Sequence, residues 1–138
     1  MAGNTTPIFS KVGDIQWIGG ITTANTTTDL TTGTSYLVFT ADATNGGYVQ
    51  KIRFRAVGSN VATVARVWIT NATGPGVAVN ATLYDEISLA ATTLSQTSAL
   101  STYELPLNFA LPIGYKLYIT LGTTVAAGYH ATTIGGKY

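Results

Sequence analysis

Hydrophobic and polar residues alternate with a period of two along most of this sequence, which is the spacing of a β-strand with one buried face. The pattern is clearest in residues 48–57, where Ile52, Phe54 and Ala56 oppose Lys51, Arg53 and Arg55. A shift of one residue in strand pairing would bury three cations, so the register of this segment is strongly set.

Eight segments carry this alternation, and none has the 3.6-residue period of a helix. They are 14–18, 35–41, 48–57, 61–70, 83–89, 102–109, 115–121 and 126–134. Many short alternating segments separated by turn residues are typical of sandwiches and barrels. We therefore expect an all-β fold, an antiparallel two-sheet β-sandwich that is jelly-roll-like and has about eight strands.

Glycine-rich sites between these segments predict turns. Asn45-Gly46-Gly47 is a strong hairpin signal, because Asn and Gly tolerate the positive φ of a tight two-residue turn. Gly135-Gly136 is also interpreted as a turn, since it lacks the spacing of a phosphate-binding loop.

We expect two parts in the chain. Residues 1–34 are rich in Thr, Asn and Gly, with a run at 19–34 that has no clear periodicity, so they form an extended, loop-rich segment. This segment is a candidate arm that orders against a neighbouring chain. Residues 35–138 form the sandwich domain.

Residues that perform chemistry are scarce. The chain has 25 Thr among 138 residues, one His and no Cys, so disulfides and thiolate metal sites are excluded. His130 has no second His or Cys with which to share a metal, and a triad of His130 with a hydroxyl and Asp85 would rest on chance. Alternation sends Asp85 and Glu86 to opposite faces, and Glu104 is better explained by salt bridges. We expect no enzyme activity, no metal and no cofactor.

The charge of the chain is low. Charged residues make up 9% of the sequence and the formal net charge is +1, which gives no long-range field toward nucleic acid or anionic lipid. We expect neither a nucleic-acid nor a membrane partner, and the amino terminus shows no secretory signal pattern. Low charge also leaves self-association unopposed, which favours a homo-oligomer.

One group of residues suggests a contact surface. If segments 48–57 and 61–70 pair, then Arg53, Arg55, Arg66 and Trp68 share one solvent face. Arg, Trp and Tyr are enriched where proteins bind one another, so this stripe is interpreted as a protein interface, together with Tyr36, Tyr129 and His130. Trp68 and the tyrosines also fit a stacking platform for sugars, which leaves a carbohydrate-binding module open as an alternative.

The last third of the chain resembles a known group. The block from Tyr103 to Thr132, YELPLNFALPIGYKLYITLGTTVAAGYHAT, and the ending IGGKY look like the carboxyl end of small proteins encoded among the virion genes of tailed bacteriophages. VATVARVWI at 61–69 and LYDEISLAATTL at 83–94 are similar to the same group.

This resemblance implies a structural virion protein, and in particular a capsid decoration (cement) protein on the phage head. Such a protein binds the major capsid protein, commonly as a trimer, and is made in the host bacterial cytoplasm. The resemblance carries no catalytic motif, so it transfers no functional residue. The alternative is a carbohydrate-binding module, such as a receptor-binding or adhesin-like sandwich, on the same kind of particle.

Overall fold

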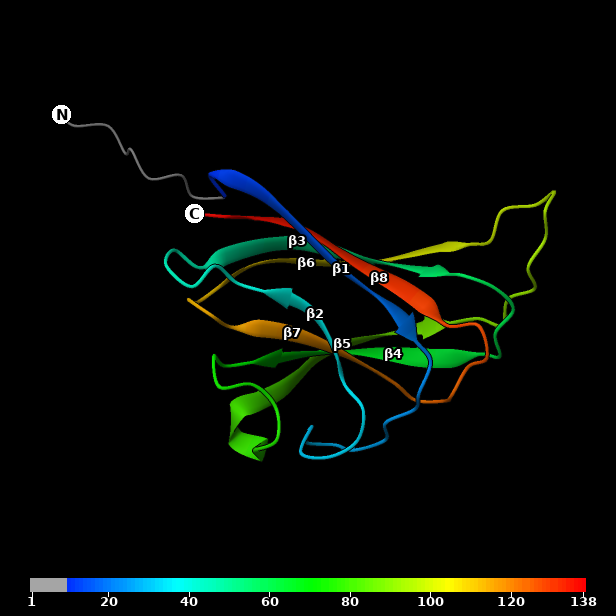
Figure 1. Cartoon of the computed structure of the whole chain (residues 1–138), viewed down its shortest axis with the longest axis horizontal. Coiled ribbons are helices and arrows are strands. Elements are labelled where there is room, and N and C mark those ends of the chain that lie inside the picture. The colour runs from blue at the N-terminus through cyan, green and yellow to red at the C-terminus, as the bar shows by residue number, and fades with distance from the viewer. Residues whose placement is uncertain (1–9) are drawn as a thin grey trace.

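The computed structural model describes residues 10–138, which fold into eight strands and one short 3-10 helix (Figure 1). The strands form two four-stranded sheets: sheet A has the order β1-β8-β3-β6, and sheet B has the order β2-β7-β4-β5. The elements are β1 (Val12–Ile21), β2 (Tyr36–Thr40), β3 (Gly47–Ala56), β4 (Thr63–Thr70), η1 (Ala78–Asn80), β5 (Ala81–Leu89), β6 (Thr102–Leu111), β7 (Lys116–Leu121) and β8 (Tyr129–Lys137).

The strand order is that of a jelly roll. All pairs are antiparallel, and four of them nest: β1 with β8, β2 with β7, β3 with β6, and β4 with β5. This is a long hairpin wrapped once around itself, and the β3–β8 and β4–β7 pairings close it into two sheets. The all-β, two-sheet, jelly-roll-like prediction with about eight strands is confirmed.

Each of the eight alternating segments contains or overlaps a strand, but two details differ from expectation. The turn at Gly46, whose φ is 76°, does not make a hairpin, because β2 and β3 lie in different sheets. Gly135 and Gly136 lie inside β8, not in a turn. A Cβ on Gly135 would lie 2.0 Å from the Tyr48 carbonyl oxygen, so glycine is needed there to let two strands approach closely.

The amino-terminal part of the described chain belongs to the sandwich. The expected strand at 14–18 extends over ten residues as β1, which pairs with β8. After β1, the loop at 22–34 is fastened to its own chain by buried Asn25. Its amide donates to the carbonyls of Thr32 and Thr34, each at 3.0 Å, and its oxygen accepts from Thr27. Residues 1–9 of the expected arm lie outside the described residues.

The core fills the space between the inner faces of the two sheets. Its largest buried members include Ile52 and Phe54 from β3, Phe39 from β2, and Leu117 and Ile119 from β7, all at 0% exposure. Burying each such side chain contributes about 1.5–3 kcal/mol, so this layer is the main source of stability. Residues 10–138 contain no helix long and apolar enough to span a membrane.

Candidate protein-binding surface

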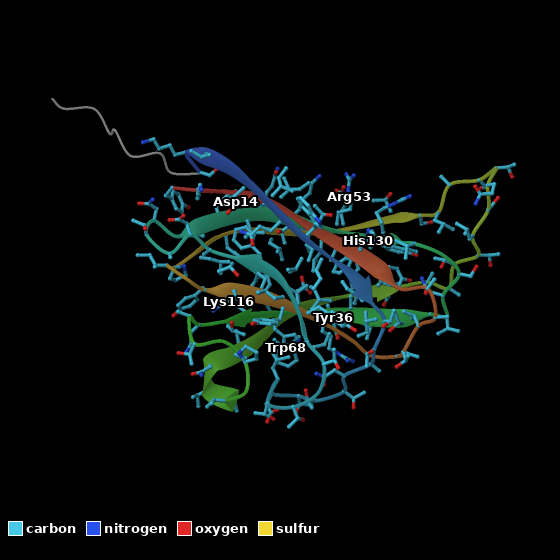
Figure 2. The ribbon with its side chains drawn as sticks, in the orientation of Figure 1. Asp14, Tyr36, Arg53, Trp68, Lys116 and His130 are labelled. Atoms are coloured by element: carbon cyan, nitrogen blue, oxygen red, sulfur yellow. The ribbon has the colours of Figure 1, made fainter. Side chains whose placement is uncertain are left out.

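The stripe predicted from the sequence does not form. It required β3 and β4 to pair, whereas β3 lies in sheet A and β4 in sheet B. Figure 2 shows Arg53 and His130 on one sheet and Trp68 on the other. Arg66 is therefore separated from Arg53 and Arg55, and it forms its own ion pair with Glu86 at 3.2 Å across β4 and β5.

Two of the predicted interface residues are buried. Trp68 is 1% exposed, and its Nε1–H donates to the Thr120 hydroxyl at 3.0 Å. Tyr129 is 0% exposed, and burial, with a smaller effect of Tyr103, raises the pKa of its phenol. Its hydroxyl has no hydrogen-bond partner within the described chain. Neither side chain reaches the surface of this chain, so neither offers a stacking plane to a sugar.

Tyr36 is half-buried and fastens the loop after β1. Its hydroxyl accepts hydrogen bonds from the backbone N–H groups of Thr23 at 3.1 Å and Thr22 at 3.3 Å. Burial raises the pKa of Tyr36, but these hydrogen bonds outweigh it, and the net pKa is lowered. The position of Tyr36 is explained by local structure.

The outer face of sheet A brings the remaining predicted residues together. Strand register sets them in rows across the sheet, because residues opposite one another point to the same side. The rows are Ile15–Ile134–Lys51–Pro106, Trp17–Thr132–Arg53–Glu104, and His130–Arg55–Thr102. We call this surface the sheet A platform.

Cations dominate the platform. Arg53 and Lys51 both bind Glu104: the Arg53 Nε–H donates at 2.8 Å, and the Lys51 ammonium donates at 3.1 Å. These hydrogen bonds, that of Arg53 first, lower the pKa of Glu104. Arg55 is held by the Leu100 carbonyl at 2.9 Å, so three cations face a single carboxylate. The surface therefore carries a net positive charge with fixed geometry.

His130 belongs to the platform but has no catalytic surroundings. Its imidazole lies over Gly19, where an added Cβ would be 3.0 Å from the ring. Asp85, the acid of the hypothetical triad, lies on β5 in the other sheet. Within residues 10–138 no group of three or more His, Asp or Glu side chains is placed to hold a metal ion.

Trp17 is the surface residue that the sequence interpretation missed. It is 72% exposed, and Ile15, two residues before it, is 56% exposed. Gln16 instead points inward, where its amide pairs with the main chain of Thr40. An exposed Trp beside an arginine row offers apolar area together with hydrogen-bond donors, which are the properties of a binding hot spot.

A surface hollow of about 220 Å³ lies elsewhere, between β4, η1 and β5. Thr, Asn, Ala, Val, Ile and one Tyr line it, without a carboxylate, imidazole or cation. Because it offers no group for proton transfer or ionic recognition, it is a weaker candidate than the platform.

Comparisons with known proteins add little. No protein-family model matches this sequence, and no curated protein matches it. Among solved structures, a chain in a structure of infectious bursal disease virus, Gx strain, aligns with 99% of this chain at 13% sequence identity and a TM-score of 0.32. The alignment covers 36% of that chain, so this protein spans about a third of its length. A TM-score of this size carries no inference about fold or function.

Proposed function

We propose that this protein is a structural component of a phage particle, a decoration protein that binds the major capsid protein on the assembled head. Two things support the proposal: the resemblance of residues 102–138 to small virion proteins, and a surface built for adhesion and not for catalysis. In this proposal the protein is not an enzyme and works without a cofactor, and it is made in the bacterial cytoplasm and becomes part of the virion.

The observation that carries the proposal is the row Trp17–Thr132–Arg53–Glu104. Trp17 is 72% exposed, and the Arg53 side chain is 45% exposed although Glu104 binds it. Because Glu104 already orders the Arg53 side chain beside Trp17, binding of a partner here loses little further side-chain entropy. The net positive charge of the platform fits an acidic patch on the capsid surface.

Repetition on a lattice would strengthen such contacts. When the folded protein binds the assembled shell, and neither binds in its unfolded or disassembled form, the binding stabilises both by mass action. Many copies held in fixed geometry act together, so modest affinity at each platform is sufficient for stable decoration.

Binding to particles tests this function. Phage heads produced without the protein are mixed with purified protein and sedimented, and the bound fraction is measured. We expect Trp17→Ala and the Arg53→Ala/Arg55→Ala double variant each to weaken binding at least tenfold. Arg66→Ala is the matched control, because Arg66 lies on the other sheet in its own ion pair. Equal binding by all variants, or no binding by the wild type, would reject the proposal.

A carbohydrate-binding module is the second candidate, and Trp17 is the observation that favours it. One exposed indole beside Arg53, Thr132 and Glu104 could stack on a sugar ring and hydrogen-bond its hydroxyls. A glycan-array screen separates the two functions. A defined glycan whose binding is lost in Trp17→Ala supports a lectin, and silence supports decoration.

The amino-terminal arm remains part of the proposal. Its first nine residues lie outside the described residues, while loop 22–34 is held internally by Asn25 and Tyr36. An arm that orders on a neighbouring chain would be cut by protease before Ser10 in the free protein and protected in the particle. Equal cleavage in both states would remove the arm from the proposal.

A further inference from the structure

The sandwich has four edge strands, and an exposed edge is a template for pairing with another chain. In sheet A the edges are β1 and β6, and in sheet B they are β2 and β5. Three of these edges carry features that oppose pairing, whereas β1 does not.

Side chains from sheet A seal the edge of β2. The Gln16 amide donates to the Thr40 carbonyl at 2.9 Å, and the Thr40 N–H donates back to Gln16 Oε1 at 2.8 Å. The Thr133 hydroxyl donates to the Val38 carbonyl at 3.4 Å. These bonds occupy the groups that an added strand would need, and β2 is only five residues long.

The edges β6 and β5 are interrupted. β6 contains Pro106, a register shift opposite Val49 and Lys51, and Asn108 with a φ of 52°. β5 has a register shift and carries Asp85 and Glu86. Proline, irregular backbone and charge are the usual devices that prevent edge-to-edge association.

The edge of β1 has none of these devices over its first seven residues. Val12–Ile18 pair with β8 in unbroken register, without proline, and with Asp14 as the one charged residue. Asp14 is half-buried and accepts a hydrogen bond from the Gln16 amide at 3.1 Å. Within residues 10–138 no strand pairs with the outer edge of β1, and exposed Ile15 and Trp17 flank Gln16 on its outer face, so the strand presents both an edge and apolar side chains.

We propose that a second copy of this chain pairs with β1 in antiparallel fashion, about a two-fold axis that passes close to Gln16. In this register Ile15 of each copy lies opposite Trp17 of the other, a favourable aromatic and β-branched pair. Asp14 lies opposite Ile18 and not opposite its own symmetry mate, so no like charges meet. The low charge of the whole chain also leaves this contact unopposed.

The pairing joins two copies of sheet A into one continuous sheet and places two platforms side by side. Trp17 of β1 takes part in both proposals, but the pairing can be tested on the purified protein without capsids, so its failure can be told apart from a failure of the capsid-binding proposal. The pairing gives a two-fold dimer instead of the trimer that the phage resemblance implies, since an isologous edge contact closes after two copies.

Sedimentation equilibrium over a wide range of concentrations tests the pairing. We expect the wild type to reach the mass of two 14.4-kDa chains, and the Ile15→Lys/Trp17→Lys variant to remain a monomer. The matched control is Val79→Lys/Ile113→Lys. It adds the same charge and removes two hydrophobic residues, 89% and 54% exposed, at sites away from β1, so it should still dimerise. Circular dichroism verifies that both variants are folded.

Cross-linking tests the register, and the absence of cysteine makes each introduced thiol unique. A mixture of Ile15→Cys and Trp17→Cys chains should form the mixed disulfide faster than either chain forms a disulfide with itself. A wild-type monomer at all concentrations, a trimer, or a dimer unaffected by the lysine pair would overturn the proposal. Preferential cross-linking of like chains would overturn the proposed register.

Discussion

Buried Asn60 joins three loops at one end of the sandwich, and its removal is the sharpest test of how this end is held together. Asn60 is 5% exposed. Its side-chain oxygen accepts from the N–H groups of Ala127 at 2.9 Å and Gly128 at 2.8 Å, and its amide donates to the Gly128 carbonyl at 3.1 Å. Its main chain exchanges two hydrogen bonds with Thr92.

The Asn60→Ala variant leaves these backbone groups without their side-chain partner. Each buried polar group left unpaired costs about 1–3 kcal/mol. The Gly128 carbonyl still accepts a hydrogen bond from the Val57 N–H at 3.1 Å, so the N–H groups of Ala127 and Gly128 are the two that lose their partner. Ala127 is half-exposed and water can partly replace its bond, so we take about 1 kcal/mol for each of the two groups, and the expected loss in the free energy of unfolding is about 2 kcal/mol. With about 2.1 cal/mol/K of unfolding entropy per residue over 138 residues, this lowers Tm by roughly 7 °C.

Urea unfolding and calorimetry of the wild type, Asn60→Ala and Asn45→Ala provide the measurement. Asn45 is exposed, and its replacement should change stability by less than about 0.5 kcal/mol. If Asn60→Ala costs no more than Asn45→Ala, the three loops are not held by this side chain and the reasoning is refuted.

Three further predictions follow from the same structure. Gly135→Ala should lower the free energy of unfolding, measured in urea, by more than about 3 kcal/mol, because the added Cβ would lie 2.0 Å from the Tyr48 carbonyl oxygen. Gly13→Ala is the control and should lower it far less, because no heavy atom lies within 4 Å of its added Cβ. Trp68→Phe should lower the free energy of unfolding by about 1–3 kcal/mol, because it leaves the buried Thr120 hydroxyl without its donor. The fluorescence of this variant should be red-shifted, because it comes from exposed Trp17, and Trp17→Phe should leave the free energy of unfolding nearly unchanged. The folded-state pKa of Glu104 lies below its ordinary value of 4.5, so its contribution to stability is present above pH 4.5 and is lost as the pH falls through the lowered value. The Tm difference between wild type and Glu104→Gln at pH 7 should therefore shrink as the solution is made progressively more acid below pH 4.5, and a constant difference would contradict this.

Local patterns predicted the strands well, because burial on one face leaves a period of two in the sequence. The segment containing Lys51, Arg53 and Arg55 shows this best, since its three cations all face solvent on the outside of sheet A. The jelly-roll-like class also followed from the number and spacing of such segments. Strand pairing was harder to predict from the sequence, because most paired strands are far apart in the chain. In residues 10–138, β4–β5 is the one pair that joins neighbours in sequence.

The prediction of one face shared by four residues was wrong for this reason. Placing Arg53, Arg55, Arg66 and Trp68 on one face assumed that consecutive strands pair, and a jelly roll sends β3 and β4 to different sheets. Trp68 also lies on the outer face of sheet B, where alternation indicates solvent. Nevertheless it is buried there outside the central core, as is Leu30 from loop 22–34, whose carbonyl binds the Gly76 N–H at 3.2 Å. Alternation reports which face a residue occupies, and not whether a loop covers that face.

The exposure of Trp17 and the inward orientation of Gln16 follow from the need to close the edge of β2. An apolar side chain at position 16 would leave the Thr40 N–H and carbonyl unpaired beside the core, at a cost greater than exposing one indole. Gln16 therefore points inward, where its side-chain amide makes the two hydrogen bonds that a neighbouring strand would make to Thr40 of β2. Side chains alternate along a strand, so Ile15 and Trp17 must then lie on the outer face of β1. The same arrangement that seals the edge of β2 thus creates the exposed apolar surface of β1, on which both the capsid-binding proposal and the dimer proposal depend.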